Sequence, residues 1–172
     1  MNIDYDLGGR ITAIEDNDAK NSSLNAPAAI DCAEWRQRPE HLRELVVTAE
    51  DCDALGHTNN VVYLRWLEVM AWQHSAVAGL DWPAYQRLNR AMVARHHDIT
   101  YLQATVSGDR LWLATWREFC DGRLRFRRGY QIINVASRKT VLQGTTEWVC
   151  VRVDNGRAAR MPAEFVAAYS PC

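Results

Sequence analysis

The stretch that decides the fold is Asn59-Asn-Val-Val-Tyr-Leu-Arg-Trp-Leu-Glu-Val-Met-Ala-Trp-Gln-His-Ser-Ala-Val-Ala78. It predicts a long helix, because Thr58 or Asn59 can cap its start with a side-chain oxygen and Gly79 can end it. Apolar residues between Val61 and Trp72 cover most of the helix circumference, whereas a surface helix has a single apolar stripe. We therefore expect a helix about 30 Å long that the rest of the domain encloses.

Strand patterns on both sides of this helix supply the enclosure. Short turn signals such as Asp121-Gly122 separate them, and such tight connections make successive strands antiparallel neighbours. We expect an α+β fold, a five-stranded antiparallel sheet wrapped around one long central helix, with a short terminal helix over Pro162–Ala168. The expected strands are Arg43–Thr48, Ala91–Val106, Arg110–Cys120, Arg123–Ala136 and Thr140–Val153.

The first 40 residues differ from the rest in composition. The segment Asn21-Ser-Ser-Leu-Asn-Ala-Pro-Ala-Ala29 is small and polar and has no periodicity, which is typical of a linker. We expect residues 1–40 to be an N-terminal extension that is partly disordered, and residues 41–172 to be the folded domain.

Composition limits the classes of function. The net charge is −1 and five cysteines are scattered without a CxxC pair, so we expect no nucleic-acid partner, no disulfide framework and no zinc or other metal site. The acidic N-terminus lacks the apolar core of a signal peptide, and no apolar run reaches the roughly 18–20 residues that span a bilayer. These features predict a cytoplasmic protein with no membrane partner.

Polar groups are concentrated where a loop leads into the long helix, in Asp51-Cys-Asp53-Ala-Leu-Gly56-His57-Thr-Asn59-Asn60. A helix start offers unpaired backbone N–H groups and a partial positive charge, which would stabilise a developing oxyanion. Asp53 and His57 can supply a base or a nucleophile beside it. The alternative is that these residues only form caps and turns, which is the commonest role of Asp and Asn at such positions.

The pattern Asp53-x-x-Gly56-His57-x-Asn59-Asn60-x-x-Tyr63-x-x-Trp66-x-Glu68 resembles the signature of the hotdog acyl-CoA thioesterases related to 4-hydroxybenzoyl-CoA thioesterase. Further similarity over residues 99–102, 108–111 and 148–162 follows in family order, so the resemblance covers about residues 43–170. It implies the hotdog fold, a homodimer or homotetramer with active sites at subunit interfaces, and hydrolysis of an acyl-CoA to free acid and CoA without a cofactor.

The resemblance also assigns site residues. It makes Asp53 the catalytic carboxylate, which either attacks the thioester carbonyl or activates a water molecule. It places the oxyanion-binding N–H groups at the helix start, and His57 and Asn60 beside them as orienting groups. The oxyanion site is expected at Asn59, Asn60 and Val61, and the substrate pocket at Tyr63, Trp66 and Glu68.

Arginines suggest where the CoA phosphates would bind. Arg123, Arg125 and Arg127 alternate along one expected strand and so share a face, with Arg128 adding a fourth charge, and arginine binds phosphate well. We expect Arg125, Arg127 and Arg128 to contact CoA. A solvated sheet face is the alternative explanation, and Arg157 and Arg160 are rival phosphate contacts.

Two other functions remain open. The His57-x-Asn59-Asn60 run also resembles acyl-carrier-protein thioesterases, but Leu55 stands where that family has an Asn, so its full catalytic set is not carried over. A non-catalytic hotdog protein that binds acyl-CoA is the other alternative, although a binder has no need of a carboxylate at Asp53.

Overall fold

The computed structural model describes residues 2–5, 11–14 and 34–171. The chain divides into two units, Met1–Asp31 and Cys32–Cys172. In the first unit, β1 (Asn2–Tyr5) and β2 (Ile11–Ile14) pair antiparallel. The disorder expected within residues 1–40 concerns mainly positions that lie outside the described residues, so it stays a prediction.

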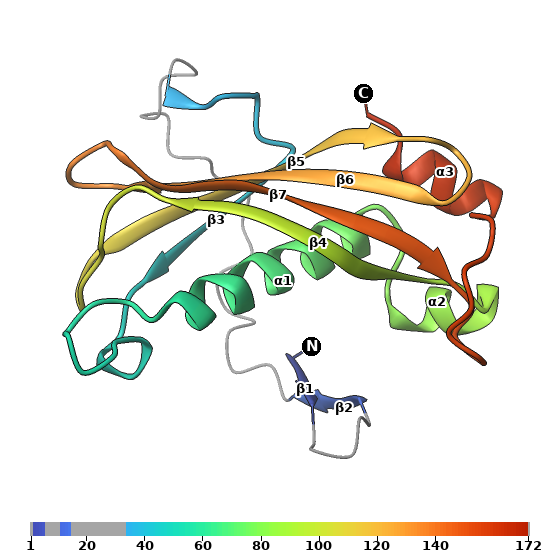
Figure 1. The fold of residues 1–172 in the computed structure, drawn as a ribbon, viewed down its shortest axis with the longest axis horizontal. Coiled ribbons are helices and arrows are strands. Elements are labelled where there is room, and N and C mark those ends of the chain that lie inside the picture. The colour runs from blue at the N-terminus through green and yellow to red at the C-terminus, as the bar shows by residue number, and fades with distance from the viewer. Residues whose placement is uncertain (1, 6–10, 15–33, 172) are drawn as a thin grey trace. The chain divides into compact units, whose positions relative to one another are not determined.

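The second unit contains a five-stranded antiparallel sheet in the order β3-β5-β6-β7-β4 (Figure 1). This confirms the predicted α+β hotdog architecture. The hairpins β5-β6 and β6-β7 place these three strands at its centre, and β3 and β4 form its edges. The strands are β3 (His41–Val46), β4 (Ala91–Tyr101), β5 (Arg110–Cys120), β6 (Arg125–Asn134) and β7 (Thr140–Val151).

The long helix α1 (Asn60–Val77) lies along one face of this sheet (Figure 1). Tyr63, Leu67 and Met70, at helical spacing, bury against apolar side chains of β5, β6 and β7. The expectation that one chain encloses the helix on every side is wrong, because Val61 is 69% exposed and Arg65 and Glu68, on the same side of the helix, are exposed too. The sheet covers one face of the helix and leaves part of the opposite face open.

Two short helices lie at the far end of α1, close to the first residues of β4 and of β6 (Figure 1). The terminal helix α3 (Ala163–Tyr169) was expected, whereas α2 (Trp82–Leu88) was not. The local signals of α2 are its N-cap Asp81, whose side chain accepts a hydrogen bond from the Ala84 N–H at 3.0 Å, and Pro83 in the first turn. Both helices contribute to a second apolar cluster, separate from the one under the first turns of α1.

Two glycines let strands and side chains approach closely. A Cβ at Gly144 of β7 would collide with the backbone of Asp98 and Ile99 on β4, and a Cβ at Gly129 of β6 would collide with the indole of Trp116. The sheet geometry around these positions therefore depends on the absence of a side chain.

In the part of the chain that the structure describes, no helix combines the length and apolarity needed to cross a membrane.

Candidate active site

The loop between β3 and α1 is closed at its base by backbone hydrogen bonds. The Asp53 N–H donates to the His57 carbonyl at 2.8 Å, and the Gly56 N–H donates to the Asp53 carbonyl at 2.9 Å. Gly56 has φ +75°, a left-handed conformation that glycine adopts without a steric penalty. The loop thus holds Asp53 and His57 together at its base, immediately before the helix.

The Asp53 carboxylate is exposed and has one of its oxygens fixed. Oδ1 accepts a hydrogen bond from the Leu55 N–H at 2.8 Å, an Asx turn that sets the orientation of the side chain. Within the described residues no hydrogen bond engages the second oxygen, Oδ2. A carboxylate held in this way keeps one oxygen for an incoming group.

The start of α1 leaves one backbone N–H unused. The Asn59 side chain caps the helix by accepting a hydrogen bond from the Val61 N–H at 2.9 Å, and the Val62 N–H donates to the Asn59 carbonyl at 2.9 Å. For the Asn60 N–H the described residues offer no acceptor. Of the three expected oxyanion positions, Asn60 is therefore the one whose N–H is unoccupied.

Asp53 and Asn60 line the same solvent-open cavity of about 410 Å³. Its remaining wall comes from the loop, from α1 and from the segment that follows β4. The lining residues are Asp53, Leu55, His57, Thr58, Asn59, Asn60, Tyr63, Tyr101, Leu102, Gln103 and Ala104.

The buried residue Thr105 connects the loop to α1 by hydrogen bonds. The Thr105 hydroxyl lies 2.6 Å from the Thr58 hydroxyl and 2.7 Å from the Tyr63 hydroxyl, and the Thr105 carbonyl accepts the Thr58 N–H at 2.9 Å. Sequence reasoning missed the role of Thr105, because a lone threonine near the end of an expected strand gives no signal of its long-range partners.

Asp51 has a structural role at the entrance to the loop. Its Oδ2 accepts hydrogen bonds from the Thr48 N–H at 2.9 Å and the Thr48 hydroxyl at 2.8 Å. Its Oδ1 accepts from Arg65 at 2.9 Å. This ion pair connects the loop entrance to the second turn of α1.

The other expected pocket residues lie further along α1. Trp66 packs edge-on against the Tyr63 ring at 5.2 Å and contributes to the core, and neither Trp66 nor Glu68 lines the cavity. Tyr63 does line it. The proposed substrate contacts of Trp66 and Glu68 stay predictions.

The three arginines expected at CoA do not share a surface. Arg125 and Arg127 are exposed on β6, and Arg127 pairs with Glu118 at 3.1 Å. Arg128 is buried on the opposite face of the strand, where it contacts His74 and Ser75 of α1. Alternation along the strand separates it from the other two.

A family model described as "Thioesterase-like superfamily" matches residues 47–169. This match covers four of the five strands of the main sheet (β3 precedes it), the loop with Asp53 and all three α-helices. No curated protein matches the sequence.

Solved structures share the fold at low sequence identity. A 1,4-dihydroxy-2-naphthoyl-CoA thioesterase from Synechocystis is similar with a TM-score of 0.66 and 19% identity over 74% of this chain and 93% of that chain. A hypothetical protein from Staphylococcus aureus in complex with CoA has a TM-score of 0.69 and 14% identity, over 76% and 85% of the two chains. A probable thioesterase from Escherichia coli has a TM-score of 0.64 and 20% identity, over 74% and 94%.

Proposed function

The chain belongs to the thioesterase-like superfamily, and from this membership we propose that it hydrolyses an acyl-CoA thioester to a free acid and CoA. The observation that carries the proposal is the convergence of the Asp53 carboxylate and the unoccupied Asn60 N–H on one open cavity. The similar structures include two thioesterases and one CoA complex, which supports the choice of substrate class.

The proposed reaction places the thioester carbonyl oxygen at the Asn60 N–H. The positive end of the α1 dipole stabilises the negative charge that develops on this oxygen. The unengaged oxygen of Asp53 either attacks the carbonyl carbon or takes a proton from the water that attacks it. The C–S bond then breaks, and the CoA thiolate leaves and takes up a proton.

The two roles of Asp53 give different isotope patterns. In a single turnover in ¹⁸O-labelled water, an attacking Asp53 forms a mixed anhydride, and the label enters the Asp53 carboxylate when water opens the anhydride at that carbon. A general base places the label in the released acid alone. Label found in the Asp53 peptide by mass spectrometry identifies attack by Asp53.

His57 and Asn59 act in this proposal as positioning residues. His57 closes the loop through its backbone carbonyl, and its exposed side chain lines the cavity. Asn59 holds the Val61 N–H, so it fixes the first turn of the helix while Asn60 binds the oxyanion.

We propose a homodimer, or a pair of dimers, as the working form. Apolar side chains around the cavity are exposed in a single chain: Leu55 is 79%, Val61 69% and Leu102 48% exposed. Such a patch is typical of a protein–protein interface, and a partner subunit that covered it would close the cavity. Light scattering of the full chain would detect the dimer by mass.

We place the CoA phosphates near Arg125 and Arg127, whose guanidinium groups are exposed. Arg128 is on the other face of β6, so we assign it a different role below.

The test is release of free thiol from a panel of acyl-CoAs that varies chain length and aromatic character. Wild type is expected to hydrolyse at least one of them, and Asp53→Ala is expected to lose that activity. Glu50→Ala, an exposed acidic neighbour outside the cavity, is the matched control and keeps it. A wild-type protein that releases no thiol would argue for a binding function. Full activity in Asp53→Ala would refute the site.

A further inference from the structure

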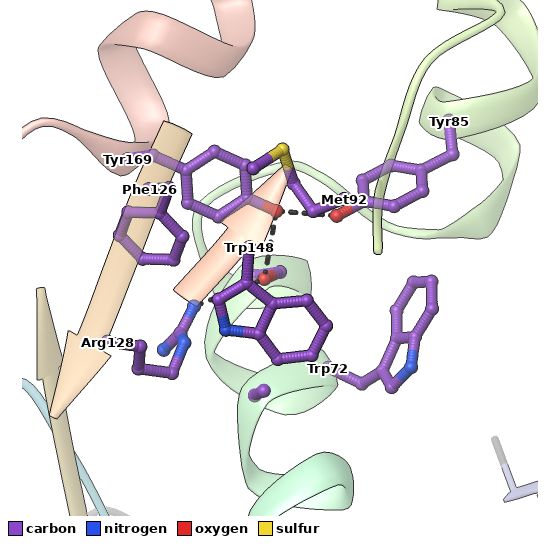
Figure 2. Close-up of a pocket in the computed structure, with 9 residues that line it drawn as sticks. Trp72, Tyr85, Met92, Phe126, Arg128, Trp148 and Tyr169 are labelled. Atoms are coloured by element: carbon purple, nitrogen blue, oxygen red, sulfur yellow. Dashed lines mark hydrogen bonds between the residues drawn. The ribbon is translucent and has the colours of Figure 1, made fainter. Parts of the chain in front are cut away.

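A second, smaller cavity lies at the opposite end of α1 (Figure 2). Ser75 on its wall is 15 residues from Asn60, or about 22 Å along the helix, so this cavity is separate from the candidate active site. Its volume is about 20 Å³, enough for one water molecule or an ion of similar size. It is lined by Ala71, Trp72, Ser75, Tyr85, Met92, Phe126, Arg128, Trp148 and Tyr169.

Arg128 brings a positive charge to this cavity, and its side chain is 2% exposed. Its guanidinium donates to His74 Nδ1 and to the Ser75 hydroxyl at 3.4 Å, and lies 5.2 Å from the centre of the Phe126 ring. No carboxylate forms an ion pair with it in the described part of the chain. Its Nε–H, which is also buried, has no hydrogen-bond partner.

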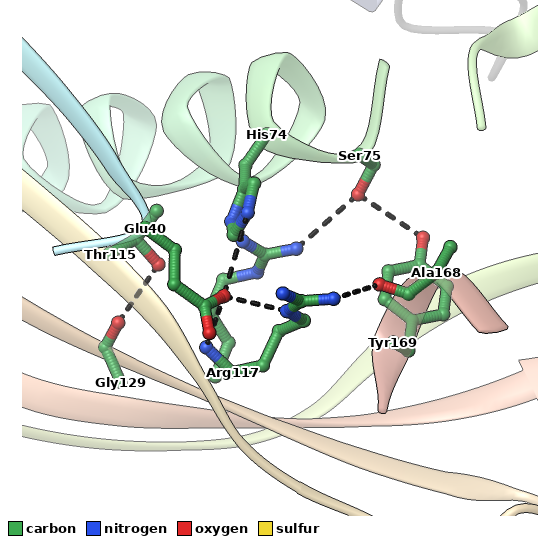
Figure 3. Close-up of polar contacts among 9 residues, drawn as sticks. Glu40, His74, Ser75, Thr115, Arg117, Gly129, Ala168 and Tyr169 are labelled. Atoms are coloured by element: carbon green, nitrogen blue, oxygen red, sulfur yellow. Dashed lines mark hydrogen bonds and ion pairs between the residues drawn. The ribbon is translucent and has the colours of Figure 1, made fainter. Parts of the chain in front are cut away.

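The surrounding polar groups do not neutralise this charge. The nearby Glu40 carboxylate is engaged by Arg117, which donates to it from Nε at 2.6 Å and from its backbone N–H at 3.1 Å (Figure 3). On the other side, the Ser75 hydroxyl accepts a hydrogen bond from the Tyr169 hydroxyl at 3.1 Å. Hydroxyl groups stay neutral, so they bring no negative charge to Arg128.

His74 does not compensate Arg128 either. A guanidinium can only donate, so Nδ1 of His74 is the acceptor and the proton of the neutral ring is on Nε2. Burial, followed by the charge of Arg128, lowers the pKa of His74 to about 3. His74 Nε2 lies 3.7 Å from Glu40, and at neutral pH this is a contact between a neutral ring and a carboxylate.

A second donor in the wall is also unused. The Trp148 Nε1–H is buried, and among the described residues it has no acceptor at bonding distance, although the Tyr130 hydroxyl is nearby. A buried charge without a counter-charge is costly, and so is a buried N–H without an acceptor. Both costs fall if an anion with acceptor oxygens or a halide ion occupies the cavity.

We propose that this cavity binds one small anionic group, which pairs with Arg128 and accepts its Nε–H. The smallest organic carboxylate, formate, is one candidate, because Phe126, Trp148 and Tyr169 lie beside the guanidinium and exclude water from the charge. A free halide ion is the other source of the same chemistry. The bound anion would link β6 to α1 and so stabilise the folded chain.

The test is thermal unfolding of the full chain against increasing sodium formate, acetate or chloride. A bulky sulfonate, too large for the cavity, keeps the ionic strength constant. For a single site we expect the unfolding temperature to rise by about 3–6 °C for each tenfold increase in anion above its Kd. Trp72 and Trp148 line the cavity, so tryptophan fluorescence should change over the same concentration range.

Arg128→Met should remove both responses, because it replaces the guanidinium by an apolar side chain of similar length. Arg123→Met is the matched control: it removes an exposed arginine just before the same strand, one that is not assigned to CoA, and should keep them. Equal responses in wild type and Arg128→Met would overturn the proposal.

A third variant keeps the test decisive if Arg128→Met does not fold. Arg128→Lys retains the charge and loses the Nε donor, so we expect at least a tenfold weaker Kd for the anion. An unchanged Kd in Arg128→Lys would also overturn the proposal. A response to carboxylates alone identifies an organic acid, and a response to chloride alone identifies a halide site.

Discussion

Asp51 and Asp53 are two positions apart, and their surroundings give them different roles. Both oxygens of Asp51 are engaged, by Thr48 and by Arg65, so this carboxylate stabilises the turn that leads into the loop. Asp53 is engaged through one oxygen only, by the Leu55 N–H. The same side chain thus acts as a structural acceptor in one position and is available for chemistry in the other.

The cap of α1 gives a prediction at a single residue. Asn59→Ala removes the side-chain oxygen that accepts the Val61 N–H, so we expect the free energy of unfolding to fall by about 1 kcal/mol. Urea unfolding followed by circular dichroism measures this. Asn60→Ala is the control, because the Asn60 side chain does not cap the helix, and an equal loss in both variants would contradict the assignment of the cap.

The candidate site shows which residues a sequence pattern can identify. Asp53, His57 and Asn60 were predicted together because they lie within eight positions of one another at a helix start, and the structure places all three on one cavity. Tyr101 and Thr105 come from a distant segment, so local spacing could not predict that they would meet the loop.

At the scale of elements, the central sheet depends on Gly144. A methyl group there would meet the backbone of β4 at Asp98 and Ile99, which cannot move away without breaking the pairing of β4 with β7. We expect Gly144→Ala to lower the free energy of unfolding by about 1–3 kcal/mol.

The neighbouring position supplies the control for this prediction. Thr145→Ala on the same strand introduces no collision and should cost less than about 1 kcal/mol. Urea unfolding of both variants tests the difference. A Gly144→Ala protein as stable as Thr145→Ala would show that β4 and β7 are not packed as described.

The elements with a strong sequence pattern were predicted, and several short elements were not. Alternation and tight turns located all five strands of the main sheet, with ends that differ by a few residues, since hydrogen bonding decides where a strand stops. The strand expected over Ala91–Val106 ends at Tyr101, because the chain then turns to line the cavity. The helix α2 has only seven residues, too few for a clear period; α3 is equally short and was predicted from Pro162 at its start.

At the scale of the whole molecule, His74 makes stability depend on pH. Its pKa is about 3 in the folded chain and 6.5 in an ordinary environment, so the unfolded chain binds a proton that the native chain does not. Above pH 6.5 the ring is neutral in both states, and His74 takes nothing from the free energy of unfolding. As the pH falls from 6.5 toward 3, the free energy of unfolding decreases by at most about 1.4 kcal/mol per pH unit. Arg128, Arg117, His41 and Glu40 are the charged or titratable groups that face His74.

His74→Gln isolates this contribution, because Gln does not titrate and still offers an oxygen to Arg128. Between pH 7.5 and 5.0, wild type should lose about 1–2 kcal/mol more of its free energy of unfolding than the variant. Urea unfolding at both pH values gives the comparison. Equal losses would mean that His74 is protonated in the native chain.

The burial of the long helix is a second property that depends on the whole molecule. Its all-round apolar sequence predicted complete burial, and one chain buries only the face toward the sheet. Val61, one of the exposed residues, follows Asn60 of the cavity wall, which agrees with the proposal that a partner subunit completes the site. Sequence alone could not separate burial within a chain from burial between chains, because both require the same apolar residues.

The central claim is that the Asp53 carboxylate carries out thioester hydrolysis, and steady-state kinetics of Asp53→Asn test it most directly. Asn preserves the shape of the side chain and can keep the hydrogen bond to the Leu55 N–H, but it neither attacks a carbonyl nor takes a proton. We predict that kcat falls by about 10²–10⁴-fold on the best acyl-CoA substrate, with KM changed little. Glu50→Gln should match wild type. A kcat for Asp53→Asn within a few-fold of wild type would contradict the account.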